Sequence, residues 1–310
     1  MKIVYFGTPE ISADILEALI GTKNEIAAIV TQPDRAKGRS GKPVFSPVKE
    51  VAVKNGIPVL QPEKARDSLF MDGLEKLGAD VFIVAAYGEL IPARILEMTK
   101  YGCINVHPSL LPKYRGAAPI PGAILNGDSV SGVTIMKMAE TMDTGDILLQ
   151  KEIVLDPKET VRSLEKKSAK LAALMLPEVL EGLEKGILVP IKQDDSKSTY
   201  IKQFSKDAGH IDFEKSAEEI ERMTRAYDPW PSAYTYLQGK TFKIFSCDVI
   251  PADESRDAGE VISADKKQLV IACGKGALSL KEVQLEGKKR MGIEEFLRGK
   301  KIEAGTKFGI

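Results

Sequence analysis

The sequence predicts an α/β protein in which a domain built on a parallel sheet, with helices on both faces, precedes a small β-barrel domain. Through residues 1–189, short apolar runs typical of buried strands alternate with segments of helical periodicity. In residues 206–310, short β-prone segments succeed one another. The polar stretch 190–205 lacks helical periodicity and is expected to link the two domains. A chain of 310 residues is long enough for both.

The first strand and helix are marked by their ends. Ile3–Phe6 has the pattern of a buried strand, and Gly7-Thr8-Pro9 supplies a turn, a capping hydroxyl and a proline suited to the first helical position. Apolar residues within 11–19 then recur at helical spacing, and Gly21 offers a stop. Because Ile26–Val30 is a second apolar run, we expect a βαβ unit here.

The same alternation continues to the end of the first domain, which calls for a parallel sheet covered on both faces. The next helix opens at Ser46-Pro47 and stops near Gly56. The elements expected after it are strand Ile57–Leu60, a helix through Leu69 and Leu77, strand Val81–Ala86, a helix around Ile95, strands Cys103–Val106, Gly132–Met138 and Ile147–Leu155, and helix Thr160–Leu183.

The second domain opens with a helix and continues with strands. Ser216, followed three residues later by Glu219, forms the pattern of a capping box. The strands expected after this helix are Ala233–Leu237, Thr241–Cys247, Gly259–Ile262, Gln268–Ala272 and Leu278–Val283.

Composition restricts the kind of protein without indicating an activity. Lysine plus arginine and aspartate plus glutamate number 44 each, so a nucleic-acid partner would have to be held by local basic patches. Three scattered cysteines fit neither a disulfide scaffold nor a metal site, and the two histidines fall in different domains. The first apolar run is too short for a signal peptide. We therefore expect a cytoplasmic protein that binds no metal and no membrane.

Ligands of open α/β sheets bind beyond the carboxyl ends of the strands, which directs attention to three loops. The first, Gly7–Glu10, lacks the glycines that let backbone approach a pyrophosphate, and Glu10 would repel phosphate. A nicotinamide oxidoreductase is therefore disfavoured. The other two loops are Ala86–Ile91 and the Pro- and Gly-rich segment that begins at the end of the strand carrying His107.

Asn105 and His107 place an amide and an imidazole two residues apart, on one face of a strand end. A lone histidine is more often structural than catalytic, but polar groups flanked by Pro and Gly are costly to retain without a function. Asp143-Thr144-Gly145-Asp146 follows a later strand and is expected to bring a carboxylate to the same sheet edge, where it would orient the imidazole. The alternative is an ordinary Asp turn with Gly145 at positive φ.

These motifs resemble a known family. NVHPSLLPKYRGAAP at residues 105–119 and DTGD at 143–146 are similar to the signature of folate-dependent formyltransferases. FGTP at 6–9, TQPDR at 31–35 and DPWP at 228–231 resemble the branch that acts on methionyl-tRNA, and the likeness covers essentially the whole chain. It implies a Rossmann-like formyltransferase domain followed by an OB-like β-barrel domain that binds tRNA.

The resemblance also implies a reaction, in which the formyl group of 10-formyltetrahydrofolate moves to the free amine of initiator methionyl-tRNA, the formylated product serving translation initiation. Asn105 would stabilise the oxyanion, His107 would take the proton of the attacking amine, and Asp143 would orient the imidazole. No metal is required. The residues that would bind folate are Ser109, Leu110, Leu111, Pro112, Tyr87 and Gly88.

Two basic clusters are candidates for holding tRNA. A long loop within residues 31–49 carries several cations and a single acid, and a second cluster lies in the barrel domain. Charge runs are often only solvated. Trp230, between two prolines, is expected to pack inside its domain rather than to stack on a base. The candidate tRNA contacts are Arg35, Lys37, Arg39, Lys42, Lys288, Lys289 and Arg290.

Two other interpretations use the same residues. A formyltransferase acting on a small amine, such as a purine precursor or a sugar nucleotide, would share the catalytic trio but would have no use for the basic loop and the barrel domain. An RNA-binding module on a disused catalytic scaffold would not need the trio intact, as it is here.

Overall fold

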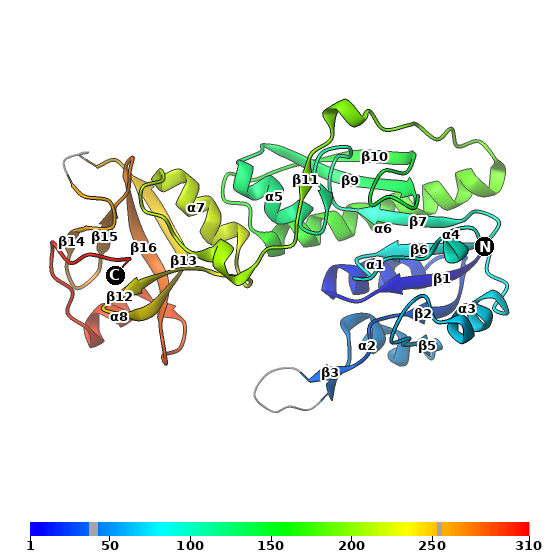
Figure 1. The fold of residues 1–310 in the computed structure, drawn as a ribbon, viewed down its shortest axis with the longest axis horizontal. Helices are drawn as coiled ribbons and strands as arrows, with labels where there is room; N and C mark the ends of the chain where they lie inside the picture. The colour runs from blue at the N-terminus through cyan, green and yellow to red at the C-terminus, as the bar shows by residue number, and fades with distance from the viewer. Residues whose placement is uncertain (37–42, 253–255, 310) are drawn as a thin grey trace. The chain divides into compact units, whose positions relative to one another are not determined.

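The computed structural model describes residues 1–36, 43–252 and 256–309, and it divides into two compact units (Figure 1). The first unit comprises Met1–Pro119, Val130–Leu155 and Arg162–Ile201. The second comprises Ile120–Ser129, Asp156–Val161 and Lys202–Ile310. Two short segments that precede residue 189 therefore pack with the second unit, and the polar stretch up to Ile201 packs with the first.

A seven-stranded sheet forms the centre of the first unit, in the order β10-β9-β7-β6-β1-β2-β5 (Figure 1). The five strands from β7 to β5 are parallel, as the alternating pattern predicts. β9 and β10 are antiparallel, so the sheet is mixed rather than parallel throughout. The strands are β1 (Lys2–Gly7), β2 (Glu25–Val30), β5 (Val59–Leu60), β6 (Val81–Ala85), β7 (Cys103–His107), β9 (Val130–Lys137) and β10 (Ile147–Val154).

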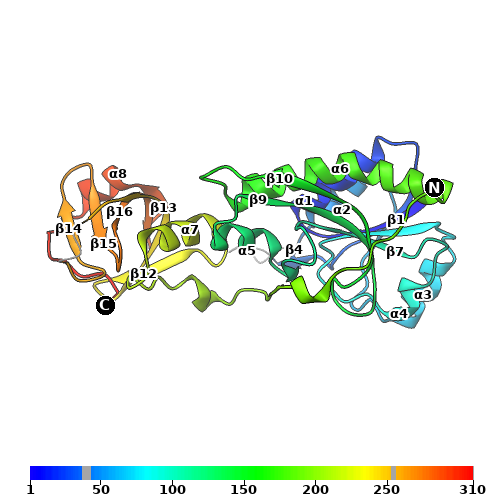
Figure 2. The same cartoon turned by 90° about the horizontal axis from the view of Figure 1, so that it is seen from above.

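Helices cover both faces of this sheet, and alternate strand residues supply two separate cores. Ile3 and Tyr5 of β1 pack with α1 (Glu10–Ile20), α2 (Pro47–Lys54) and α6 (Val161–Lys185). Val4 and Phe6 pack on the other face with α3 (Ser68–Glu75) and α4 (Ala93–Leu96). Figure 2 shows α6 on one side of the sheet and α3 and α4 on the other. Among the helices described, none is both long and apolar enough to cross a membrane.

Two small ladders lie beside this sheet. β3 (Arg35–Ala36) pairs with β4 (Pro43–Val44) on either side of residues 37–42. β8 (Arg115–Gly116) pairs in parallel with β11 (Tyr200–Ile201), just after the short 3₁₀ turn η1 (Asp195–Lys197). Backbone bonds from the β8 segment to Thr199 and Ile201 hold the polar stretch against the first unit.

The second unit is built on an antiparallel sheet in the order β12-β13-β16-β15-β14, with β17 paired to β16. The sequence predicts a small β-barrel domain here, and the structure confirms a small β domain whose strands are antiparallel. The helix α7 carries the predicted capping box, in which Ser216 and Glu219 bond reciprocally. The elements are α5 (Pro119–Asn126), η2 (Lys206–Gly209), α7 (Ala217–Ala226), β12 (Ala233–Leu237), β13 (Lys240–Ile250), β14 (Val261–Ala264), β15 (Leu269–Ala272), β16 (Ala277–Leu285), β17 (Met291–Gly292) and α8 (Ile293–Gly299).

Candidate active site

Asn105 and His107 lie at the carboxyl end of β7, in the interior of the sheet between β6 and β9. Because they are two residues apart on a strand, their side chains share a face. The His107 side chain is almost fully buried, and Asn105 is half-buried. The strand therefore holds an amide and an imidazole in a fixed spacing on a rigid support.

Asp143 reaches these residues by a route that differs from the one expected. We expected it to follow a strand that ends at the same sheet edge, but β9 runs antiparallel to β7, and Lys137 at its end lies opposite Ile104. The connection between β9 and β10, residues 138–146 (the Asp143 loop), therefore has to double back toward His107. It does so with Asp143 itself at a φ of 56°.

Gly145 in the same loop serves close approach rather than an unusual φ. It is not among the glycines at positive φ, so the alternative of an ordinary Asp turn with Gly145 at positive φ is wrong. A Cβ atom at this position would lie 1.7 Å from the carbonyl oxygen of Lys137. Glycine is needed because the loop passes directly against the end of β9.

The Asp143 carboxylate lies close to the side chains of both His107 and Asn105. Its Oδ1 lies 3.8 Å from His107 Nδ1 and accepts a long, 3.4 Å hydrogen bond from Asn105 Nδ2. Its Oδ2 accepts a 2.7 Å bond from the backbone N–H of Gly116. The side chains of His107 and Asp143 are 6% and 11% exposed, so their interaction is little screened by water.

The orientation of the imidazole is set by a main-chain carbonyl. His107 Nε2 lies 3.0 Å from the carbonyl oxygen of Tyr114, which can only accept, so Nε2 carries the hydrogen. In the neutral ring Nδ1 is then an unprotonated acceptor, and it faces another acceptor, Asp143 Oδ1. The Tyr114 carbonyl therefore helps to orient the ring, and the role expected for Asp143 stays a prediction.

Residues 108–118 form a loop after β7 (the motif loop) whose backbone is anchored by buried side chains. Ser109 is fully buried, and its hydroxyl donates to the carbonyl oxygen of Lys113 at 2.7 Å. The hydroxyl of Thr134, on the neighbouring strand β9, donates to the carbonyl of Ser109 and accepts the N–H of Leu111. Gln150 Nε2 donates to the carbonyl of Leu111 at 2.9 Å. The expected folate-binding turn is thus rigid.

Leu110 and Pro112 complete this turn and are half-buried. Leu110 packs so closely on β9 that a Cβ atom at Gly132 would lie 2.4 Å from its Cδ2 atom. The peptide bond between Leu111 and Pro112 is cis.

Tyr87 and Gly88 follow β6, whose carboxyl end lies beside that of β7. The Tyr87 ring is buried edge-on against Phe6, with centroids 5.5 Å apart, and its carbonyl oxygen accepts a bond from the Thr8 hydroxyl. Burial raises the pKa of the Tyr87 phenol well above its usual value. Gly88 has a φ of 89° and open space where a side chain would lie.

The roles of two residues at this site could not be predicted from sequence motifs or periodicity. Gln193 lies in the stretch expected to be a linker, yet its Nε2 donates to the carbonyl oxygens of Asp143 and Gly145, at 2.8 and 2.7 Å. Arg115 is part of the motif, but nothing in the pattern shows that its side chain is buried and directed at Gln193.

Family models match both units of this chain. The model described as formyl transferase matches residues 1–180, and the model of the formyl transferase C-terminal domain matches residues 203–301. A methionyl-tRNA formyltransferase from Lachnospira eligens is 51% identical over the full length of both chains. The chain belongs to the methionyl-tRNA formyltransferase family. A second relative of that name, from Agathobacter rectalis, is 46% identical over the full length of both.

Solved structures of lower identity share the fold of this formyltransferase family member. The sugar 3N-formyl transferase WlaRD matches with a TM-score of 0.66 at 20% identity, covering 93% of this chain and 99% of its own. HypX from Aquifex aeolicus, solved in complex with tetrahydrofolic acid, matches with a TM-score of 0.66 at 17% identity, covering 96% of this chain and 47% of its own.

The basic residues expected to bind tRNA differ in exposure and in whether they are already paired. Arg35 is exposed on β3, whereas Lys37, Arg39 and Lys42 lie outside the described residues. Lys288 and Lys289 are exposed, and Lys289 pairs loosely with Glu295 at 3.3 Å.

Arg290 differs from its two neighbours because its guanidinium is already engaged. It bonds both carboxylate oxygens of Asp228 and one of Glu282, and it stacks 3.9 Å from the ring centroid of Phe245. Trp230 lies in the same loop as Asp228 and is 60% exposed, so the expectation that it packs inside the domain is wrong.

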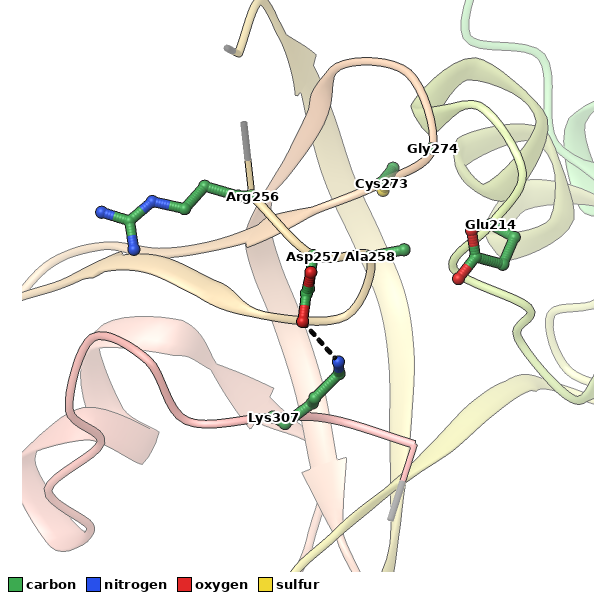
Figure 3. Close-up of a pocket in the computed structure, with 7 residues that line it drawn as sticks. All are labelled: Glu214, Arg256, Asp257, Ala258, Cys273, Gly274 and Lys307. Carbon is green, nitrogen blue, oxygen red and sulfur yellow. Dashed lines mark hydrogen bonds and ion pairs between the residues drawn. The ribbon is translucent and has the colours of Figure 1, made fainter. Parts of the chain in front are cut away.

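The second unit contains a separate cavity of about 410 Å³ (Figure 3). An ion pair of 3.0 Å between Asp257 and Lys307 lies at this cavity, and none of the residues expected from the sequence to form a site lines it. In the parts of the chain that the structure describes, no group of three His, Cys, Asp or Glu side chains is placed to hold a metal ion. The lining residues are Glu214, Arg256, Asp257, Ala258, Cys273, Gly274 and Lys307.

Proposed function

We propose that this chain transfers the formyl group of 10-formyltetrahydrofolate to the free amino group of initiator methionyl-tRNA. The observation that carries the proposal is the convergence of Asn105, His107 and Asp143 in one half-buried cluster at the carboxyl end of β7. The amine acceptor is supported by the two full-length relatives named methionyl-tRNA formyltransferase. The folate donor is supported by the HypX structure, whose fold this chain shares and which was solved with tetrahydrofolic acid.

Asn105 is suited to stabilising the oxyanion that forms when an amine attacks the formyl carbon. Among the described residues, its Nδ2 group makes only a long bond, to Asp143 Oδ1 at 3.4 Å, so no strong partner there uses its donor capacity. An oxygen that gains negative charge accepts a shorter and stronger hydrogen bond than a neutral carbonyl does. Asn105 therefore binds the transition state more tightly than the substrate.

His107 is suited to accepting the proton of the attacking amine at Nδ1. That nitrogen bears no hydrogen in the neutral ring, because Nε2 donates to the Tyr114 carbonyl. Once Nδ1 is protonated, the ring is a cation 3.8 Å from Asp143 Oδ1, and the carboxylate stabilises it. The proton then passes to the folate nitrogen as its bond to the formyl carbon breaks, so charge and protons balance with no metal.

The folate co-substrate is proposed to bind between the motif loop and the loop after β6. Ser109 contributes through the shape of the turn, because its hydroxyl is already bonded to Lys113. Leu110 and Pro112, which are half-buried, offer apolar surface next to the catalytic face, and the buried Leu111 contributes through the rigid backbone of the turn. Gly88, with open space at its Cα, lets a flat ring approach the main chain.

The tRNA is proposed to be held by cations of the two clusters. Arg35 in the first unit and Lys288 and Lys289 in the second are exposed, and the same role is proposed for Lys37, Arg39 and Lys42, which lie outside the described residues. Arg290 is a weaker candidate, since its charge is neutralised by Asp228 and Glu282. The exposed indole of Trp230 adds a surface on which a base can stack.

The test is incubation of the protein with 10-formyltetrahydrofolate and charged initiator tRNA, with N-formylmethionine released from the tRNA as the readout. Parallel reactions contain an amino-sugar nucleotide or a small purine precursor in place of tRNA. Formylation of the tRNA alone supports the proposal. Formylation of a small amine alone would assign a different acceptor, and tRNA binding without any transfer would indicate an RNA-binding protein that has lost catalysis.

A further inference from the structure

We infer that Gln193 is a positioning residue for the reaction, holding the Asp143 carboxylate in place through the main chain of the Asp143 loop. This inference rests on the proposed function, because it assigns Gln193 a part in the same transfer. Gln193 lies outside the catalytic motifs, in a polar stretch with no secondary-structure pattern.

Both hydrogens of the Gln193 amide are directed at the Asp143 loop. Nε2 donates to the carbonyl oxygen of Asp143 at 2.8 Å and to that of Gly145 at 2.7 Å. These two carbonyls belong to a connection that doubles back from the end of β9, with Asp143 at a φ of 56°. A non-glycine residue in that region is strained by about 1–2 kcal/mol, so the loop needs bonds of this kind to stay there.

The other end of the amide is fixed by a buried cation. Gln193 Oε1 accepts from Arg115 Nη2 at 2.8 Å and from Nε at 3.1 Å. The Arg115 side chain is only 2% exposed, and it also bonds the Asp195 carboxylate and the Tyr200 hydroxyl. A guanidinium can only donate, so it binds the amide oxygen and excludes the amide nitrogen. Arg115 thereby dictates that the two N–H groups of Gln193 face the loop.

Asp143 is consequently held from two sides by one short strand. Arg115 of β8 positions Gln193, which holds the main chain at Asp143, while the next residue, Gly116, donates its N–H to Asp143 Oδ2. The carboxylate is left with Oδ1 directed at Asn105 and His107. Loss of Gln193 should leave the Gly116 bond in place but let the loop shift, which changes the distance from Oδ1 to Nδ1.

The expected consequence is a loss of turnover without a loss of substrate binding, because the carboxylate stabilises the imidazolium only after proton transfer begins. A displacement of about 1 Å at a catalytic group can reduce the rate by ~10²-fold. We expect Gln193→Ala to lower kcat by ~10- to 100-fold with KM for folate and tRNA changed little. The pH–rate profile should change as well, because the position of the carboxylate relative to His107 Nδ1 changes.

The decisive experiment is a double-mutant cycle with Asp143→Asn, in which kcat is measured for both single variants and the pair. If Gln193 acts through the Asp143 carboxylate, Gln193→Ala should cost less than ~2-fold once that carboxylate is gone. An equal loss of kcat in both backgrounds, or an unchanged kcat in the single variant, would overturn the inference. Wild-type activity is measured alongside, so a failure of the proposed function appears as no formylated tRNA from any variant.

Two further variants separate positioning from folding. Gln193→Glu keeps an acceptor for Arg115 but replaces the donor by an oxygen facing two carbonyls, so it should fold and lose kcat as Gln193→Ala does. Asn55→Ala is the matched control, because Asn55 Nδ2 makes a 2.8 Å bond to the carbonyl of Val51 at the end of α2, with no link to Asp143. Thermal unfolding of all variants reports stability, and only the Gln193 variants should lose kcat. Retention of full kcat by Gln193→Glu would contradict the inference.

Discussion

At the scale of single residues, the proposed chemistry depends on which nitrogen of His107 is free. The Tyr114 carbonyl takes the Nε2 hydrogen and leaves Nδ1 as an acceptor that faces a carboxylate. Two hydrogen-bond acceptors 3.8 Å apart do not attract each other until one of them is protonated. The carboxylate therefore interacts favourably with the imidazolium and not with the neutral ring.

Removal of either His107 or Asn105 should abolish most turnover. We expect His107→Ala and Asn105→Ala each to lower kcat by at least ~10²-fold, because one removes the base and the other the oxyanion donor. Turnover is followed as formylated methionyl-tRNA, with folding checked by thermal unfolding. His210→Ala supplies the control, since the second histidine lies in the second unit, packed on Tyr234 and Tyr236. Near-normal turnover in His107→Ala would disprove the mechanism.

Replacement of the Asp143 charge should damage chemistry more than binding. Asp143→Asn keeps an oxygen for the Gly116 N–H but loses the negative charge near Nδ1. We expect kcat to fall by ~10- to 100-fold, a part of the ~10²–10⁴ that acid–base catalysis contributes. The acidic limb of the pH profile should shift, while the affinity for folate, measured by equilibrium titration, stays unchanged. A loss confined to folate affinity would reassign Asp143 to substrate binding.

The three cysteines should be inert in the folded protein. Cys103, Cys247 and Cys273 are buried, and burial raises the pKa of each thiol to about 12, so almost no thiolate exists at about pH 8. We expect no alkylation by iodoacetamide at that pH, followed by mass spectrometry, until denaturant is added. Because the folded pKa values lie above the ordinary value of 9.0, this contribution to stability is complete below about pH 9 and is lost as pH rises toward about 12. Rapid native alkylation of any one thiol would show that its site opens.

At the scale of elements, strands and helices follow from local pattern, whereas the route of a connection does not. The run Ile3–Phe6, the stop at Gly21 and the capping box at Ser216 are each encoded within a few residues, and each occurs as expected. The direction of β9 depends on long-range pairing, for which the sequence carries no local signal. For the same reason the role of Gln193 could not be predicted, because the carbonyls to which it donates lie 50 and 48 residues away in the sequence.

The β8–β11 ladder should tolerate no side chain at Gly116. This residue has a φ of 111°, and a Cβ atom there would lie 2.3 Å from the carbonyl oxygen of Ile201. We expect Gly116→Ala to lower the free energy of unfolding by at least ~1 kcal/mol from φ alone. We also expect it to reduce kcat, because the clash with Ile201 displaces the backbone N–H that donates to Asp143. Denaturant titration measures the first effect and the transfer assay the second.

Gly73 provides the control for that substitution. It lies within the helix α3, and an added Cβ atom would meet no other atom within 4 Å, so Gly73→Ala should be neutral or stabilising by up to ~1 kcal/mol. If Gly116→Ala were as stable and as active as Gly73→Ala, the close packing of β8 on β11 would not support the site.

At the scale of the whole molecule, charge is balanced overall and uneven locally. With 44 basic and 44 acidic residues, the field of the protein attracts no polyanion at long range. Binding of tRNA must therefore depend on particular exposed cations, many of the others being paired, as Lys185 is with Glu181. In the proposed arrangement each unit has its own cluster of basic residues that contacts tRNA, including Arg35 in the first unit and Lys288 in the second.

The salt dependence of tRNA binding tests whether basic residues of both units contact the tRNA. Each lost phosphate contact should reduce the slope of log affinity against log salt by ~0.7–0.9, the range for single- and double-stranded nucleic acid. We expect Arg35→Ala and Lys288→Ala each to weaken tRNA binding and lower this slope, with folate affinity unchanged. Lys185→Ala removes the same charge from an ion-paired position on α6 and should leave the slope as it is. If all three variants gave the wild-type slope, Arg35 and Lys288 would be merely solvated, and the contacts would have to lie with the other exposed cations.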